Sequence, residues 1–174
     1  YINGVYAGIS GMSYHGAFIG FIIASFLFCK RNKVSFWFLA DIAVLGISAG
    51  YVLGRIGNFV KHELVGRVSD VAWAINVNGV LRHPSQIYEA ILEGVLVFFI
   101  LYYYRTRKSF DGELAIMYGV LYSVMRIIAE FFREPDLQLG FIYSNWLTMG
   151  MLISFVSFIF SLTALYYIKR VKKA

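Results

Sequence analysis

Five long apolar stretches constrain this 174-residue chain more than any other feature of its sequence. The hydrocarbon core of a bilayer is about 30 Å thick, which roughly 20 helical residues cross. Neither proline interrupts a stretch, and only 15% of the residues are charged, against about 25% in soluble domains. We therefore predict an all-α polytopic membrane protein with a single domain over residues 1–174. Its transmembrane helices are expected at about residues 10–29, 34–53, 86–104, 114–132 and 146–168.

Clusters of lysine and arginine indicate how these helices are oriented. They follow the first, third and fifth stretches, and basic loops tend to remain on the cytoplasmic side of a membrane. The C-terminus is therefore expected in the cytoplasm, and the long loop of residues 54–85 on the opposite, periplasmic side. The formal net charge of +6 follows from this pattern and gives no support for a nucleic-acid partner. The clusters comprise Lys30, Arg31, Lys33, Arg105, Arg107, Lys108, Lys169, Arg170, Lys172 and Lys173.

The outer loop carries a signal for local β-structure. The pair Asn78-Gly79 separates two runs rich in strand-forming residues, 71–77 and 80–82. An Asn-Gly pair in this setting favours a two-residue hairpin turn. We therefore expect a small β-hairpin within the loop.

Ionisable and polar side chains gather near the outer ends of four stretches, although a charge at the centre of a span costs about 2.5–3.5 kcal/mol. Tyr122, Arg126 and Glu130 recur every four residues and share one helical face. That face must turn toward the bundle interior or a water-filled cavity. Arg55 is expected at the same depth on another helix, and two arginines at one depth predict an anion such as a phospholipid phosphate. The same layer contains His15, Asn58, Tyr88 and Glu89.

The remaining polar residues have simpler interpretations. Asp41 is interpreted as a structural hydrogen-bonding group, and Glu93 is assigned no function. An ion pair between Arg126 and Glu130 that only fixes helix packing is an alternative to a functional site. The three histidines lack the spacing of metal ligands, so the sequence predicts neither a metal site nor a cofactor.

Four segments carry these polar residues in a characteristic order. Residues 54–63 read G-R-I-G-N-F-V-K-H-E, and residues 83–89 read H-P-S-Q-I-Y-E. Residues 11–17 read G-M-S-Y-H-G-A, and residues 126–136 read R-I-I-A-E-F-F-R-E-P-D. Together they resemble the prolipoprotein diacylglyceryl transferase family, whose signature is similar to G-R-x-G-N-F-x-x-x-E. Departures from the usual family residues occur at Ala17, Lys61 and Val65.

The resemblance implies a seven-helix enzyme of the bacterial inner membrane, of which this chain is expected to lack the first two helices. Such an enzyme transfers the diacylglyceryl group of phosphatidylglycerol to the lipobox cysteine of a prolipoprotein signal peptide. A thioether forms and glycerol phosphate is released, in the first step of lipoprotein maturation. The implied active site faces the periplasmic leaflet of the bilayer and needs no cofactor.

The resemblance also suggests roles for individual residues. Arg55 and Arg126 would clamp the phosphate and stabilise the leaving group, and Glu130 would orient Arg126. His15 would accept the thiol proton, with a structural, hydrogen-bonded histidine as the alternative. The other members of the expected substrate-binding set are Asn58, Glu63, Gly66, Tyr88, Glu89 and Tyr122.

Two other classes of protein remain as alternatives. A phospholipid phosphatase or head-group transferase would share the arginines but release a different product. A transporter would use Arg126 and Glu130 along an ion path, and transporters typically have broken helices and midplane sites. The polar residues here gather in one leaflet, which favours the lipid enzyme.

Overall fold

The computed structural model describes residues 14–135, 140–143 and 146–172, and the chain is mainly helical. Three of the helical segments, α3, η1 and α4, follow one another without a break, and η1 has the wider π-helical geometry. Two compact units are distinguished, residues 1–39 and 40–174. In chain order the elements are α1 (Tyr14–Asn32), α2 (Phe36–Val60), β1 (Ile75–Val77), β2 (Val80–Arg82), α3 (Ser85–Glu89), η1 (Ala90–Leu96), α4 (Val97–Tyr104), α5 (Glu113–Glu130), β3 (Phe141–Tyr143), β4 (Leu147–Thr148) and α6 (Met149–Val171).

The first unit holds α1 and the start of α2. Helix α1 ends with Lys30 and Arg31 in its last turn, where positive charge complements the helix dipole. The chain then turns at Lys33, which has a positive φ of 55°. The hydroxyl of Ser35 accepts a hydrogen bond from the backbone N–H of Phe38 at 3.3 Å. Ser35 therefore caps the start of α2.

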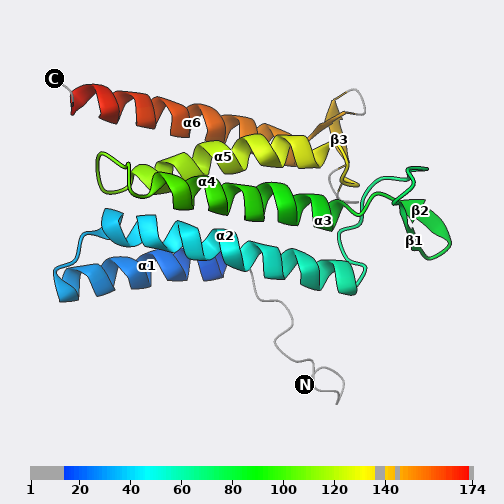
Figure 1. The fold of residues 1–174 in the computed structure, drawn as a ribbon, viewed down its shortest axis with the longest axis horizontal. Coiled ribbons are helices and arrows are strands. Elements are labelled where there is room, and N and C mark those ends of the chain that lie inside the picture. Colours follow the sequence, from blue (N-terminus) through cyan, green and yellow to red (C-terminus); the bar gives the residue numbers. More distant parts are fainter. Residues whose placement is uncertain (1–13, 136–139, 144–145, 173–174) are drawn as a thin grey trace, which may run out of the picture. The chain divides into compact units, whose positions relative to one another are not determined.

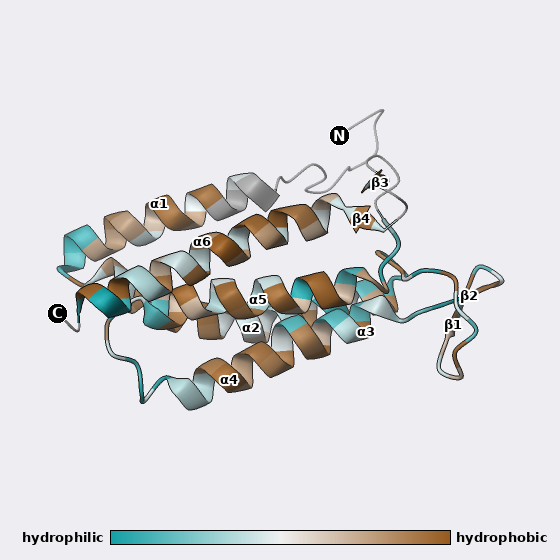
Figure 2. Cartoon of the chain, turned by 90° about the horizontal axis from the view of Figure 1, so that it is seen from above, coloured by the Kyte–Doolittle hydropathy of each residue, from teal (hydrophilic) through white to brown (hydrophobic). Residues whose placement is uncertain are grey.

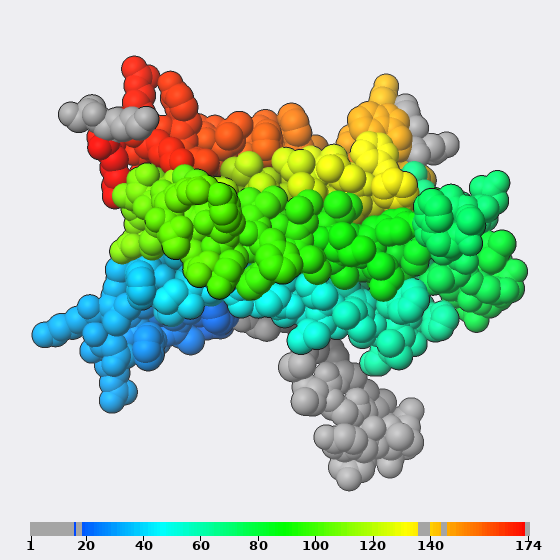
Figure 3. Space-filling view, viewed as in Figure 1, coloured from blue at the N-terminus to red at the C-terminus, as the bar shows by residue number. Residues whose placement is uncertain are grey.

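The second unit is a bundle in which α5 packs against α6 on one side and against α3, η1 and α4 on the other (Figure 1). Its apolar core contains Val44 of α2, Val97 and Leu101 of α4, and Leu114 of α5. Figure 3 shows the green side chains of residues 85–104 filling the face between the cyan α2 and the yellow part of α5.

Glycines allow close helix contacts at two places in this bundle. A Cβ atom on Gly94 would lie 2.5 Å from Val52 Cγ2, and one on Gly119 would overlap the hydroxyl of Ser161. Small residues permit such approaches between membrane helices. Gly46, Gly50 and Gly54, which recur every four residues on α2, make no such contact, because an added Cβ there meets no atom within 4 Å in the described part of the chain.

The polarity of the bundle is inverted relative to a water-soluble protein. Glu89, Glu93 and Glu113 are 0% exposed, whereas Phe99 is 61% and Phe160 76% exposed. Figure 2 shows the hydrophobic colouring along α4 and α6 and hydrophilic colouring in the loops. Three helical segments are long and apolar enough to cross a membrane, by length and composition: Phe36–Val60, Ser85–Tyr104 and Met149–Val171. They correspond to three of the five predicted spans, and the other two spans, 10–29 and 114–132, overlap α1 and α5.

The predicted β-hairpin is present. Strands β1 and β2 pair antiparallel, with Val77 opposite Val80. Asn78 and Gly79 both have positive φ, 54° and 86°, as the two central residues of a type I′ turn require. A second, unpredicted pair of short strands, β3 and β4, precedes α6.

Candidate functional site

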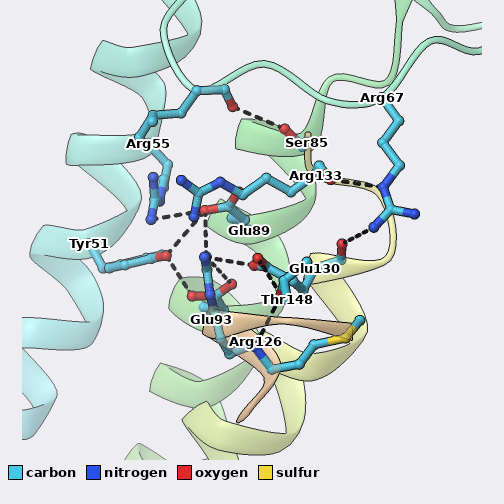
Figure 4. Close-up of polar contacts among 12 residues, drawn as sticks. Tyr51, Arg55, Arg67, Ser85, Glu89, Glu93, Arg126, Glu130, Arg133 and Thr148 are labelled. Carbon is cyan, nitrogen blue, oxygen red and sulfur yellow. Dashed lines mark hydrogen bonds and ion pairs between the residues drawn. The ribbon is translucent and has the colours of Figure 1, made fainter. Parts of the chain in front are cut away.

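Five charged side chains from α2, the continuous rod of α3 and η1, and α5 converge inside the bundle, and we call them the arginine cluster: Arg55 of α2, Glu89 of α3, Glu93 of η1, and Arg126 and Glu130 of α5 (Figure 4). Their side chains are largely buried; those of Arg55 and Arg126 are 14% and 10% exposed. Burying charge is costly unless the groups pair. The cluster therefore needs the pairings described next.

One carboxylate oxygen of Glu89 bridges both arginines. Glu89 Oε2 lies 2.9 Å from Arg55 Nη2 and 3.1 Å from Arg126 Nη1. The hydroxyl of Tyr51 approaches the same oxygen at 3.4 Å. The other oxygen, Oε1, is buried and has no hydrogen-bond partner among the described residues. Two guanidinium groups from different helices are thus directed at one point.

Glu93 extends the cluster one turn further along the same helical rod. Its Oε1 lies 3.5 Å from Arg126 Nη1, and its Oε2 accepts a hydrogen bond from the Tyr51 hydroxyl at 2.5 Å. Glu93 belongs to the π-helical segment η1, and such segments are frequent at functional sites.

Glu130 holds the other side of Arg126. Its Oε2 lies 2.7 Å from Arg126 Nη2, and its Oε1 accepts a hydrogen bond from Thr148 Oγ1 at 2.9 Å. With every group ionised, the cluster's two arginines and three glutamates carry a net charge of −1. Its own carboxylates therefore already neutralise the arginines, and an anionic ligand has to compete with them.

Tyrosine rings cover one side of the cluster. The Arg55 guanidinium lies over the Tyr51 ring, 4.8 Å from its centroid, a cation–π distance. Tyr122 meets Tyr51 edge to face at 6.0 Å and stacks on Tyr118 at 5.6 Å. Tyr122 therefore contacts the cluster through Tyr51.

The loop between α2 and α3 is joined to the C-terminal end of α5. Arg67 Nε donates to the backbone oxygen of Arg133 at 2.9 Å, and its Nη2 donates to that of Glu130 at 3.3 Å. Gly66 forms an antiparallel bridge with Arg133, and a Cβ there would overlap the carbonyl of His83. Gly66 is therefore needed for the close contact between the loop and the helix end.

The signature residues Asn58 and Glu63 lie on either side of the junction between α2 and this loop, Asn58 in the last turn of the helix and Glu63 in the loop. The backbone oxygen of Asn58 accepts from Glu63 N at 2.9 Å, and that of Glu63 accepts from Gln86 Nε2 at 2.7 Å. These contacts shape the loop through its backbone. The Glu63 side chain is exposed and is not part of the arginine cluster.

Tyr88 faces a different environment from its neighbour Glu89. Its hydroxyl accepts a hydrogen bond from Trp73 Nε1 at 2.5 Å, and its ring packs against Phe132 at 5.4 Å. It borders an apolar pocket of about 380 Å³, which is lined by Val71, Trp73, His83, Tyr88, Ile91, Leu92 and Phe132. Tyr88 is thus placed beside the outer loop and outside the charged network.

The sequence-predicted residues therefore divide into three groups. Arg55, Glu89, Arg126 and Glu130 contact one another directly, and Tyr122 adjoins them. Asn58 at the end of α2, the loop residues Glu63 and Gly66, and Tyr88 make their described contacts outside this network. The side chain of His15 lies outside the described residues, so its role stays a prediction.

Three residues of the site were not predicted: Tyr51, Glu93 and Thr148. Tyr51 precedes Arg55 by four residues, just as Tyr122 precedes Arg126, so the repeated spacing was a usable signal. Glu93 follows Glu89 by four residues on the same rod. Thr148 is the N-cap residue of α6, and a threonine before an apolar run is a helix-start signal.

A second polar group, the loop cluster, lies where α4 is connected to α5 and comprises Asp41, Lys108, Asp111, Glu113 and Lys169. Of these, Asp41 and Glu113 are buried. Asp41 accepts from Lys108 Nζ at 2.8 Å and from the backbone N–H groups of Gly112 and Ala115 at 3.0 Å each. This confirms the predicted structural role of Asp41, which caps α5 from α2. Hydrogen bonds to Asp41 and Asp111 raise the pKa of Lys108.

Glu113 completes the loop cluster. Its Oε1 lies 2.6 Å from Lys169 Nζ and accepts from the Tyr104 hydroxyl at 2.8 Å. Its Oε2 accepts from the backbone N–H of Ser109 at 2.5 Å. In the described ranges, no group of three or more histidine, cysteine, aspartate or glutamate side chains is arranged to hold a metal ion.

Comparison with known proteins gives a family match over almost the whole chain. Residues 2–167 match the family described as prolipoprotein diacylglyceryl transferase. A relative from Aliarcobacter butzleri is 72% identical over 156 residues, which cover 90% of this chain and 57% of the relative. A relative from Wolinella succinogenes is 57% identical over 87% of this chain and 56% of its own length.

A third relative, from Campylobacter curvus, is 53% identical over 97% of this chain and 62% of its own length. All three are named phosphatidylglycerol–prolipoprotein diacylglyceryl transferase. The chain therefore spans between 56% and 62% of the length of these relatives.

Proposed function

This chain belongs to the prolipoprotein diacylglyceryl transferase family, and we propose that the whole protein transfers the diacylglyceryl group of phosphatidylglycerol to a prolipoprotein. The acceptor is the thiol of the lipobox cysteine in the prolipoprotein signal peptide. The relatives' names support both substrates. The arginine cluster is the proposed binding site for the phosphate of the lipid.

In the proposed reaction, the thiol sulfur forms a bond to the terminal glyceryl carbon of the diacylglyceryl group. The bond between that carbon and the phosphate oxygen breaks, and its electron pair remains on the oxygen of the departing glycerol phosphate. The thiol proton passes to a base, for which His15 is the proposed acceptor. Arg55 and Arg126 stabilise the negative charge on the phosphate as the bond breaks.

The observation that carries this proposal is the bridging oxygen of Glu89. Arg55 Nη2 and Arg126 Nη1 lie 2.9 and 3.1 Å from it, which are distances for charge-assisted hydrogen bonds. A phosphate oxygen offers the same kind of acceptor as a carboxylate oxygen. The two guanidinium groups are therefore spaced to share one anionic oxygen, and the lipid phosphate would take over the contacts that Glu89 makes.

The membrane arrangement supports the same reading. Arg55 lies five residues before the end of α2, and Arg126 lies four residues before the end of α5. At 1.5 Å per residue, both lie within about 8 Å of the C-terminal end of their helix. The end of α2 leads to the loop before α3, and the end of α5 leads to the segment before β3. We propose that these ends face the periplasmic leaflet of the inner membrane, with the C-terminus cytoplasmic and with five spans of a seven-helix protein in this chain.

A transfer assay with the whole protein tests the proposal. Vesicles contain phosphatidylglycerol labelled in its diacylglyceryl group, and the acceptor is a peptide with a lipobox cysteine. Arg55→Ala and Arg126→Ala should each lower kcat at least about 100-fold, as the loss of a charge-stabilising donor does. The matched control is Arg107→Ala, whose guanidinium lies over the Tyr103 ring at 4.3 Å in the loop after α4.

The products separate the alternatives. A transferase gives a labelled thioether peptide and glycerol phosphate, whereas a phospholipid phosphatase gives a free lipid product and an unlabelled peptide. Transfer at the normal rate by both cluster variants would show that the arginines have no part in the reaction.

A further inference from the structure

The start of α6 contacts the arginine cluster through one side chain. Thr148 has an extended backbone conformation, with φ −102° and ψ 163°, and its hydroxyl accepts a hydrogen bond from Met151 N at 3.2 Å. The same hydroxyl donates to Glu130 Oε1 at 2.9 Å. Thr148 is 2% exposed, so water does not compete strongly for either bond.

The carboxylate of Glu130 is also confined by the backbone of α6. A Cβ on Gly150 would lie 2.8 Å from Glu130 Oε1 and 3.0 Å from its carboxyl carbon. The carboxylate therefore sits directly against the first turn of a 23-residue helix, where the unpaired N–H groups and the helix dipole favour negative charge.

These contacts fix Glu130 on the side away from Arg126. Glu130 Oε1 accepts the hydrogen bond from the Thr148 hydroxyl, and Glu130 Oε2 lies 2.7 Å from Arg126 Nη2. Arginine has many rotamers, and its orientation depends on what its guanidinium contacts. Arg126 Nη1 is held by Glu89 and Glu93, whereas Nη2 is held by Glu130.

We propose that Thr148 is a positioning residue that sets the orientation of Arg126 through Glu130, with Gly150 providing the space for the Glu130 carboxylate. This inference rests on the proposed function, in which Arg126 binds the lipid phosphate. The start of α6 is thereby part of the anion-binding apparatus, although none of its residues belongs to the charged cluster.

The chemistry explains why a hydroxyl is needed at position 148. The group must accept from a backbone N–H and at the same time donate to a carboxylate, and a hydroxyl does both. Serine keeps this pair of bonds. Valine has nearly the same shape as threonine but can make neither bond.

The test measures transfer kinetics and lipid binding in the whole protein for Thr148→Val, Thr148→Ser and Glu130→Gln. Thr148→Val should lower kcat/KM about tenfold to 100-fold, the size expected for a lost hydrogen bond to a charged group. The loss in kcat/KM should be distributed between kcat and KM in the same proportion as the loss caused by Glu130→Gln. Thr148→Ser should recover most of the activity.

The double variant Thr148→Val with Glu130→Gln tests whether Thr148 acts on Arg126 through Glu130. If Thr148 acts through Glu130, the double variant is little worse than Glu130→Gln alone, because the two effects are not additive. If the two losses multiply, Thr148 acts independently and the inference is wrong. The matched control is Thr163→Val, an exposed threonine on the same helix, which should leave kcat and KM unchanged.

A different result is expected if Thr148 only caps α6 and does not position Arg126. Loss of the helix cap alone would lower the melting temperature while the folded fraction kept its normal kcat and KM. That outcome, with phosphatidylglycerol still raising the melting temperature as in the unmodified protein, would overturn the inference. Failure of the proposed function is recognised separately, because the unmodified protein would then not transfer diacylglyceryl at all. The phosphatidylglycerol-dependent melting shift would in that case still report the effect of Thr148→Val.

Discussion

The carboxylates of the arginine cluster and the Asp41 and Glu113 carboxylates of the loop cluster are all buried, but the two clusters satisfy them in different ways. In the loop cluster, backbone N–H groups bind Asp41 at 3.0 Å and Glu113 at 2.5 Å, and lysines bind both residues. In the arginine cluster, the carboxylates contact the side chains of arginine, tyrosine and threonine residues, and Glu89 Oε1 has no hydrogen-bond partner among the described residues. A carboxylate held by backbone donors fixes the fold, whereas one held by side chains alone can exchange its partners.

The two clusters also differ in their position and in how their charged groups are paired. Asp41 and Arg55 are 14 residues apart on α2, which corresponds to about 21 Å along a helix. Asp41 and Glu113 each face a lysine, whereas in the other cluster Arg126 pairs with three glutamates and one of these, Glu89, also pairs with Arg55. The comparison favours a structural role for the loop cluster, and it agrees with the proposal that the arginine cluster binds an anion.

The largest effect on stability is expected for Asp41→Ala. It removes the acceptor for Gly112 N, Ala115 N and Lys108, and we expect it to destabilise the protein by about 3 kcal/mol through the lost cap and charged hydrogen bond. Thermal unfolding in detergent measures the loss. The KM for phosphatidylglycerol of the remaining folded protein should be unchanged, and a change in that KM would break the proposed division of roles.

Two glutamate variants, one in each cluster, form a matched pair for which we expect effects of intermediate size. Glu113→Gln should destabilise the protein by about 2 kcal/mol, because a neutral amide binds Lys169 and Ser109 less strongly. Glu93→Gln removes one of three negative charges shared by two arginines. It should leave stability nearly unchanged and lower the KM for phosphatidylglycerol several-fold, since an anion then meets less repulsion. Melting curves and lipid titrations of both variants provide the readout, and equal destabilisation by both would contradict the comparison.

The smallest effect is expected at the exposed edge of the loop cluster. Asp111 binds Lys108 at 2.9 Å, but its side chain is 48% exposed. Asp111→Asn should change the free energy of unfolding by less than about 1 kcal/mol, as for other exposed ion pairs. A loss as large as that of Asp41→Ala would mean that burial does not determine which carboxylate stabilises the loop.

Much of the helical framework could be predicted from hydrophobic length, and the hairpin from Asn78-Gly79, because both are local properties of the sequence. The shared face of Arg126 and Glu130 follows from their spacing of four residues. The convergence of Arg55 and Arg126 on Glu89 depends on how three helices pack, which the sequence of one helix does not contain. The capping of α5 by Asp41 likewise joins residues more than 70 positions apart.

Other features were missed for local reasons. Glu93 was assigned no function, since nothing in the sequence indicated that Tyr51 would donate to it. The π-helical segment η1 has the same apolar composition as an ordinary α-helix, so hydropathy did not distinguish it. Glu63 matched the family signature, yet its described contact is made through its backbone oxygen.

The π-helical segment has a consequence for how this span tolerates insertions and deletions. Ala90–Leu96 separates Tyr88 and Glu89 from the apolar α4, and each of its π-helical turns holds one residue more than an α-helical turn. A one-residue deletion here can therefore be absorbed, because the segment closes as an ordinary α-helix and Glu89 keeps its direction. The same deletion in the regular α4 would turn Glu89 by about 100° relative to the residues that follow, although either shortened span would remain long and apolar enough for a bilayer.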